Sequence, residues 1–170
     1  MTRGGLHEVD GRWRLEFVRR LPYRLDDVWR GLTDPRYLRG WFPAEIQGER
    51  EAGARLRFVF PDDPGPASHG EMVTYDPPSV LEFRWDVDLL RFELSPEGDS
   101  TVLTFSDTFE ELGKAAREGA GWHACLDLFE YELADDDPPW NPAERWEQLH
   151  DSYVEQLGPE ASTVGPPELT

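Results

Sequence analysis

The sequence predicts a single α+β domain in which a curved antiparallel sheet of about six to seven strands wraps around a long helix. Two observations carry this prediction. Residues 12–108 divide into short segments of alternating hydrophobicity separated by turn residues, which is typical of antiparallel strands. Residues 121–133 change to a helical period and place Trp122, Leu126, Phe129 and Leu133 on one face. We infer that this apolar face packs against the sheet and leaves a cavity between them.

The N-terminal part of the chain opens with a strand and two short helices. Residues 1–11 show no clear pattern, and we expect a flexible lead there. The predicted elements that follow are a strand at residues 12–21 and helices at residues 25–32 and 35–40. Thr33 or Asp34 is a suitable N-cap for the second helix, and Pro35 suits its first position.

The middle of the chain predicts further strands at hairpin spacing. These are placed at residues 44–48, 55–60, 69–75, 80–85, 89–94 and 101–108. In the second of them, Leu56, Phe58 and Phe60 alternate with arginines, so the three apolar side chains are expected to point inward. The inward face of residues 69–75 stays undecided, because large apolar side chains fall on both faces.

The C-terminal part predicts two helices. The long helix can extend backward to residues 114–118, although Gly119 and Gly121 oppose a regular start. An acidic, proline-rich segment ends it. A last helix at residues 142–157 is expected within a segment, residues 135–158, that packs on the main domain of residues 12–134. Residues 159–170 are expected to be a disordered tail.

Charge and composition exclude several classes of function. The formal net charge is −18, which opposes binding to nucleic acids or to anionic membrane surfaces. No apolar run approaches the length of about 20 residues that a membrane span needs, and the first residues lack a signal-peptide core. Cys125 is the only cysteine, so the chain has no internal disulfide and fits a reducing cytoplasm.

Three segments of the sequence resemble a known family. They are residues 21–29 with Leu32-Thr33-Asp34-Pro35 and Trp41-Phe42, then Val80-Leu81-Glu82-Phe83-Arg84-Trp85, and finally Gly121-Trp122 with the apolar positions after it. Together they resemble the SRPBCC superfamily, the helix-grip group that includes START domains, polyketide cyclases and birch-pollen-allergen-like proteins. Within it, the resemblance is to homologues of the activator of a heat-shock protein's ATPase, and it spans roughly residues 12–133.

This resemblance implies a sheet that grips the long helix, with a cavity between the two. Members of the superfamily bind apolar molecules or cyclise polyketides there. The matching residues are mainly structural, so no catalytic residue is assigned. We expect ligand-contacting side chains among the inward aromatic and apolar residues, the alternative for each being simple core packing. They are Trp41, Phe58, Phe60, Met72, Phe83, Trp85, Phe92, Phe105, Trp122, Leu126 and Phe129.

Few polar residues are candidates for chemistry in such a cavity. His69, Glu71 and Tyr75 share one face of a predicted strand and, if that face lines the cavity, would position or protonate a carbonyl ligand. His123 is 100° round the helix from Trp122 and is expected to flank the cavity. The histidines lack metal-ligand spacing and no cofactor motif occurs, so neither a metal nor a cofactor is predicted. Cys125 borders an apolar stripe and is expected to be an inert thiol.

Three functions follow, in order of preference. The first is binding of a small apolar or aromatic molecule in the cavity. The second is a protein-interaction or regulatory module, acting as a chaperone partner or homodimer, whose acidic surface would favour a basic partner. The third is a cyclase- or hydrolase-like enzyme that uses the same cavity, with His69 and Glu71 as its candidates.

Overall fold

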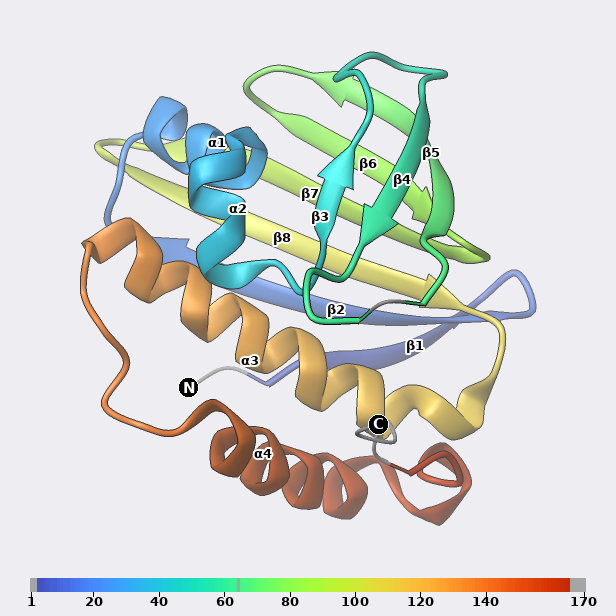
Figure 1. Cartoon of the computed structure of the whole chain (residues 1–170). Coiled ribbons are helices and arrows are strands. Elements are labelled where there is room, and N and C mark those ends of the chain that lie inside the picture. Colours follow the sequence, from blue (N-terminus) through green and yellow to red (C-terminus); the bar gives the residue numbers. More distant parts are fainter. Residues whose placement is uncertain (1–2, 64, 166–170) are drawn as a thin grey trace.

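The computed structural model describes residues 3–63 and 65–165 (Figure 1). Within them, the strands are β1 (Gly5–Val9), β2 (Arg12–Leu21), β3 (Glu45–Gln47), β4 (Arg55–Val59), β5 (Ser68–Asp76), β6 (Val80–Trp85), β7 (Asp88–Glu97) and β8 (Ser100–Phe109). The helices are α1 (Leu25–Thr33), α2 (Pro35–Trp41), α3 (Ala115–Ala134) and α4 (Pro142–Leu157), with short 3₁₀ helices η1 (Leu112–Lys114) and η2 (Pro159–Ala161). This arrangement confirms the predicted α+β helix-grip architecture.

All strands of the described residues form one antiparallel sheet of order β1-β2-β8-β7-β6-β5-β4-β3. The sheet has eight strands, more than the predicted six to seven, because residues 5–9 pair with β2. Asp10 and Gly11 make the connecting turn with φ angles of 51° and 78°, and an Asp-Gly pair of this kind is a strong hairpin signal. The expectation of a flexible lead over residues 1–11 is therefore wrong for residues 5–11, while residues 1–2 lie outside the described part of the chain.

The two short helices form where the sequence predicts them. Asp34 caps α2, because its carboxylate accepts a hydrogen bond of 2.9 Å from the backbone N–H of Arg36, and Pro35 occupies the first turn. The Trp41 indole then donates to the carbonyl oxygen of Gly31 at 3.0 Å. This bond fixes the angle between α1 and α2 and holds the Trp41 ring against the core.

The long helix α3 crosses one face of the sheet, as Figure 1 shows in orange. Its predicted apolar stripe is buried: Trp122, Leu126 and Phe129 are at most 6% exposed. The Phe129 ring lies 4.8 Å from that of Trp41, and the Trp122 ring lies 5.1 Å from that of Phe105 on β8. The helix grip thus includes aromatic contacts along the apolar face of α3, which contribute about 0.5–1.5 kcal/mol per pair beyond simple burial.

The last helix, α4, lies beside α3 on the side away from most of the sheet (Figure 1). Tyr153 is the centre of this contact and is fully buried. Its hydroxyl accepts a hydrogen bond of 2.8 Å from the backbone N–H of Gly4 and lies 2.9 Å from Nδ1 of His123. Because the hydroxyl accepts from Gly4, its own proton is free to be donated to the histidine. One side chain therefore joins α4, α3 and the residue that leads into β1.

Charged side chains reinforce the same junction. Asp127 of α3 accepts from Arg19 of β2 at 2.8 Å and from Arg145 of α4 at 3.0 Å. Arg19 also pairs with Glu130 at 2.6 Å, although its side chain is only 9% exposed. Removal of any one charged side chain from this network would be strongly destabilising, because its partner would remain as an unpaired charge in a buried place. These contacts join α4 to α3, and α3 to β2.

The segment after α4 departs from the predicted disordered tail. η2 follows directly, Ala161 is 2% exposed, and the backbone N–H of Val164 donates to the carbonyl of Gly113 at 3.0 Å. The remainder of the predicted tail, residues 166–170, lies outside the described residues. No helix in the described part of the chain has the length and apolar character needed to cross a bilayer.

A matched pair of glycine substitutions tests the packing of α4 on α3. A Cβ at Gly119 would lie 2.9 Å from Tyr153, whereas a Cβ at Gly121 would meet nothing closer than Trp146 at 3.9 Å. We expect Gly121→Ala to stabilise the protein by about 0.5–1 kcal/mol through helix propensity, and Gly119→Ala to lose about 1–3 kcal/mol through overpacking. Urea unfolding measures both. Equal effects at the two positions would contradict the observed docking of α4.

Candidate functional site

An open cleft of about 430 Å³ lies where the β6–β7 turn, the first half of α3 and α4 meet. It is lined by Pro43, Phe60, Trp85, Asp86, Val87, Asp88, Leu90, Lys114, Arg117, Glu118, Gly121, Trp122, Cys125 and Trp146. The lining combines large apolar side chains with a group of charged residues. Such a mixture is the usual composition of a small-molecule site, in which apolar surface gives affinity and a few polar groups give orientation.

The apolar wall of the cleft is built around Trp85. Its ring stacks on Phe58 at a centroid distance of 4.6 Å and an interplanar angle of 10°. Phe42 packs against it at 5.6 Å, and Trp122 from α3 meets it edge-on at 6.4 Å. Because Phe58 is fully buried behind it, Trp85 has a fixed position while part of its surface stays accessible. The wall is therefore preformed.

A hydrogen bond fixes the second tryptophan of the wall. Nε1 of Trp122 donates to Oδ2 of Asp107 at 3.1 Å, and both residues are buried. An indole has one donor and no acceptor, so a buried tryptophan needs a partner of this kind. The bond attaches α3 to β8 beneath the cleft and orients the Asp107 carboxylate at the same time.

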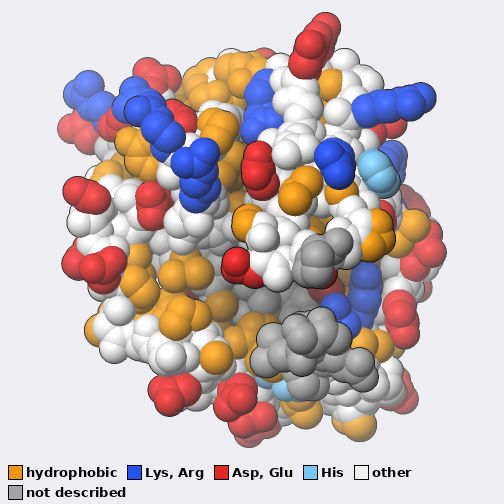
Figure 2. Space-filling model, viewed as in Figure 1, with side chains coloured by type: hydrophobic (Ala, Val, Ile, Leu, Met, Phe, Trp, Pro, Cys, Tyr) orange, Lys and Arg blue, Asp and Glu red, His pale blue; other side chains and the backbone are white. Residues whose placement is uncertain are grey.

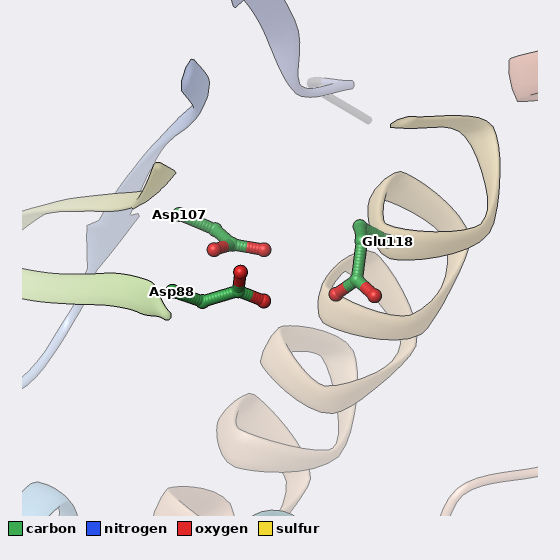
Figure 3. A group of neighbouring side chains, drawn as sticks. All are labelled: Asp88, Asp107 and Glu118. Carbon is green, nitrogen blue, oxygen red and sulfur yellow. The ribbon is translucent and has the colours of Figure 1, made fainter. Parts of the chain in front are cut away.

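Three carboxylates meet at the inner end of the cleft, and we call them the carboxylate trio: Asp88, Asp107 and Glu118 (Figure 3). Asp107 pairs in register with Leu90, two residues beyond Asp88, so both aspartates point to the same face of the sheet. Glu118 reaches them from α3. One oxygen of each residue lies within 4.8 Å of the others. Lys114 is the neighbouring cation, with its Nζ 3.3 and 3.2 Å from the two oxygens of Asp88.

The surroundings of the trio favour the protonated forms of its acids. Burial raises the pKa of Asp107 well above its usual value, and repulsion from Glu118 and Asp88 adds to the effect. Burial also raises the pKa of Glu118, while the attraction of Lys114 opposes the change. The pKa of Asp88 is raised by burial as well and is again held back by Lys114. Negative charge is thus disfavoured here, and it is least well compensated at Asp107.

Family comparison connects this geometry to known proteins. Residues 22–134 match the family model described as "Activator of Hsp90 ATPase homolog 1-like protein". The chain belongs to this family. The family is a branch of the SRPBCC superfamily, so the resemblance noted in the sequence is confirmed. No curated protein matches the chain.

Solved structures with the same fold are similar to this family member over most of its length. CalU16 from Micromonospora echinospora has a TM-score of 0.70 at 20% identity, covering 91% of this chain and 95% of that one. EF2215 from Enterococcus faecalis, described as a conserved protein of unknown function, has a TM-score of 0.74 at 23% identity, covering 91% and 90%. BPP1335 from Bordetella parapertussis has a TM-score of 0.67 at 23% identity, covering 93% and 96%. At these identities the likeness shows the fold alone.

The predicted ligand-contacting residues separate into two groups. Phe60, Trp85 and Trp122 line the cleft of this family member. Phe60 is 37% exposed just after β4, at the cleft, so the expectation that it points into the core is wrong. The others are buried at 5% exposure or less and pack into the core, which favours the alternative of core packing. They are Trp41, Phe58, Met72, Phe83, Phe92, Phe105, Leu126 and Phe129.

The predicted polar residues do not converge on the cleft. His69 and Glu71 are exposed and pair in register with Arg57 and Arg55, on the face of the sheet opposite to the core. Tyr75 is not on their face, because a bulge between Met72 and Thr74 reverses the alternation. It packs instead against Trp29 at 5.6 Å. The expected grouping of these side chains in a cavity is therefore wrong.

His123 and Cys125 behave differently from each other. His123 is fully buried against Tyr153 and Phe17 rather than beside the cleft, so the expectation that it flanks the cavity is wrong. Cys125 does line the cleft, but burial raises the pKa of its thiol to about 12. A thiol that stays protonated at neutral pH is a poor nucleophile, and this supports the expectation of an inert cysteine.

The residues that sequence analysis missed are the carboxylate trio and Lys114. A search for histidine and cysteine spacing could not find them, because they come from three separate elements. A signal was nevertheless present. Asp107 continues the inward alternation of Leu103 and Phe105, and Glu118 lies one helical turn before Trp122. Carboxylates at positions where the pattern requires apolar side chains are therefore a signal that sequence analysis can use to choose candidate residues.

Removal of charge from the trio is expected to stabilise the protein. Because the pKa of Asp107 is raised in the folded protein, folding either takes up a proton at this residue or leaves a charge buried. Asp107 therefore opposes folding increasingly as the pH rises above the usual pKa of an aspartate. Asp107→Asn keeps an acceptor for Trp122 and removes the charge. We expect a gain of about 1–3 kcal/mol at pH 7 in EDTA, measured by urea unfolding. The gain should shrink toward pH 4, and a loss of stability at pH 7 would contradict this reading.

Acid destabilisation is expected from His123. Burial lowers its pKa from 6.5 to about 4; nearby Arg19 and Arg145 act in the same direction, and Asp127 opposes them. Between these two pH values the unfolded chain binds a proton that the native protein excludes, so stability falls as the pH decreases through this window. His123→Gln keeps a polar partner for Tyr153 but cannot titrate. Its unfolding free energy should depend less on pH, by at most about 1.4 kcal/mol per unit. Identical slopes for the two proteins would refute the assignment.

Proposed function

We propose that this protein binds a small apolar or aromatic molecule in the cleft between the β6–β7 turn, α3 and α4. The observation that carries the proposal is the open volume of about 430 Å³ beside the fixed rings of Trp85 and Trp122. Pockets of about 300–1,000 Å³ with aromatic walls are the usual size and lining for small-molecule ligands. Membership of a superfamily whose fold is associated with ligand binding supports the same conclusion.

The cleft also defines the general shape of the ligand. Trp85, Val87 and Trp146 offer apolar surface for a flat, hydrophobic body. The inner end presents carboxylates beside Lys114, which together supply hydrogen-bond acceptors and a donor. A ligand with an apolar body and one polar end matches both regions, because apolar surface gives affinity and a few polar groups give orientation.

The other functions have weaker support. His69 and Glu71, the candidates for a cyclase- or hydrolase-like enzyme, lie outside the cleft, so these two residues do not support that hypothesis. For an interaction module, Figure 2 shows basic side chains gathered over α1 and α2, a segment that contains Arg30, Arg36 and Arg39. This gathering is small compared with the acidic excess, and it does not identify a partner. The chaperone-partner and homodimer hypotheses, and the expected cytoplasmic location, stay predictions.

A substitution that fills the cleft tests the proposed function. Gly121 lines the cleft, and a Cβ there would contact only Trp146. We expect Gly121→Leu to retain the fold, because replacing a helical glycine favours the helix, while its side chain occupies the binding volume. Binding of the uncharged dye Nile red, followed by fluorescence, should weaken about tenfold or more.

Gly121→Ala is the matched control, since it makes the same backbone change but leaves most of the volume open. It should bind Nile red within about threefold of the unchanged protein, well under the tenfold step that corresponds to about 1.4 kcal/mol. Native mass spectrometry of the freshly purified protein gives a second readout for a retained natural ligand. Equal dye affinities for the leucine and alanine variants would rule out this cleft as the site.

A further inference from the structure

The carboxylate trio places three acids where their charges repel one another. The three side chains point toward a common centre from β7, β8 and α3 (Figure 3). Oxygen atoms of all three lie within 4.8 Å of one another. In a partly buried place this repulsion is poorly screened, so the arrangement is unfavourable unless positive charge or protons compensate it. By itself, such a cluster does not define a site.

An unpartnered atom of Asp107 supplies a second and independent observation. The side chain is 0% exposed, and its Oδ2 is used by the Trp122 indole. Its Oδ1 has no hydrogen-bond partner among the described residues. Figure 3 shows the Asp107 carboxylate directed toward Asp88 and Glu118. Buried polar atoms in folded proteins nearly always have a partner, and an exception calls for a missing ion or water.

Side-chain cations leave much of the charge uncompensated. Among the described residues, Lys114 is the only cation in ion-pair contact with the trio, and it contacts Asp88. Arg117 lines the same cleft and attracts Glu118 at longer range, without an ion pair. Asp107 and Glu118 therefore lack a direct positive partner at the point where their oxygens approach each other.

We propose that Asp88, Asp107 and Glu118 bind a hard divalent cation, with Ca²⁺ as the best fit. The three ligands are all carboxylate oxygens, which hard cations prefer over the nitrogen and sulfur ligands of zinc or copper sites. Two oxygens on one Ca²⁺ ion are at most about 4.6–5.2 Å apart, twice the Ca–O distance, and the limit for Mg²⁺ is about 4.0–4.2 Å. The oxygens of the trio lie within 4.8 Å of one another, a span that one Ca²⁺ ion can bridge at its ordinary Ca–O distances.

The surroundings fit such a site. Trp122 holds the Asp107 carboxylate from behind, as a hydrogen bond to a metal-binding carboxylate commonly does. Asp88 and Glu118 line the cleft, so coordination positions that the protein does not fill face open space. Water, or an oxygen of a bound molecule, can occupy them. The cation site requires the trio alone and does not depend on the proposed apolar ligand.

Metal titration of the full chain tests this proposal. The protein is stripped with EDTA and exchanged into metal-free buffer that contains about 150 mM KCl. At this ionic strength the Debye length is about 8 Å, so the charges of the acidic surface are screened. The protein is then titrated with CaCl₂, MnCl₂ or MgCl₂ by calorimetry. We expect one saturable site that prefers Ca²⁺ and Mn²⁺ over Mg²⁺, and a rise in melting temperature on saturation. Asp107→Asn should weaken Ca²⁺ binding at least about tenfold. Because this variant should be more stable without metal, lost binding cannot be attributed to unfolding.

Two further variants make the test specific. Asp99→Asn removes the same charge from the surface, where the Asp99 side chain is 92% exposed. This control variant should leave the Ca²⁺ affinity unchanged. Lys114→Met removes the ammonium group that competes for Asp88, so it should increase Ca²⁺ affinity several-fold. A protein that binds neither Ca²⁺ nor Mn²⁺, or an Asp107→Asn variant that binds them normally, would overturn the proposal in favour of a shared proton. Nile red binding measured in EDTA separates this failure from failure of the proposed function.

Discussion

The structure depends on one constraint, namely that α3 must be buried on two sides at once. One side carries the apolar stripe of Trp122, Leu126 and Phe129 against the sheet. The other carries Gly119, His123 and Asp127, which receive α4. A helix that is covered on two sides cannot have a single apolar face, and its polar residues must therefore find partners inside the protein. Tyr153 and the arginines of β2 and α4 are those partners.

This double burial also decides where the cleft lies. The interior between α3 and the sheet is filled by aromatic rings, and the cleft opens at the end of the helix where the β6–β7 turn and α4 diverge. Trp122 stands at this boundary, with its ring in the wall of the cleft and its N–H on Asp107. The same contact that completes the core thus presents a carboxylate to the site. Asp107 therefore affects stability in two opposite ways, because its carboxylate accepts the hydrogen bond from Trp122 while its buried charge is unfavourable.

The fold could be predicted from the sequence because its strands and helices follow regular periods. Residues 12–21, 80–85 and 142–157 were predicted with the bounds that the structure shows. The site was predicted only in part, because periodicity shows which side chains are buried but not whether the space between them is filled. Phe83 and Phe92 have the same inward pattern as Trp85, yet they fill the core while Trp85 faces the cleft. The face of the sheet on which Tyr75 lies could not be predicted for a different reason, namely a β-bulge that no local residue signals.

The contact between Gly4 and Tyr153 joins residues that are 149 positions apart in the chain. During synthesis, β1 leaves the ribosome long before α4 has been made, so the early strand and the exposed side of α3 must wait for their covering helix. Contacts of such large sequence separation form late and slowly, and the surface that waits for them is prone to aggregation in the meantime. This protein is therefore exposed to aggregation until α4 has been synthesised and Tyr153 has bonded to Gly4.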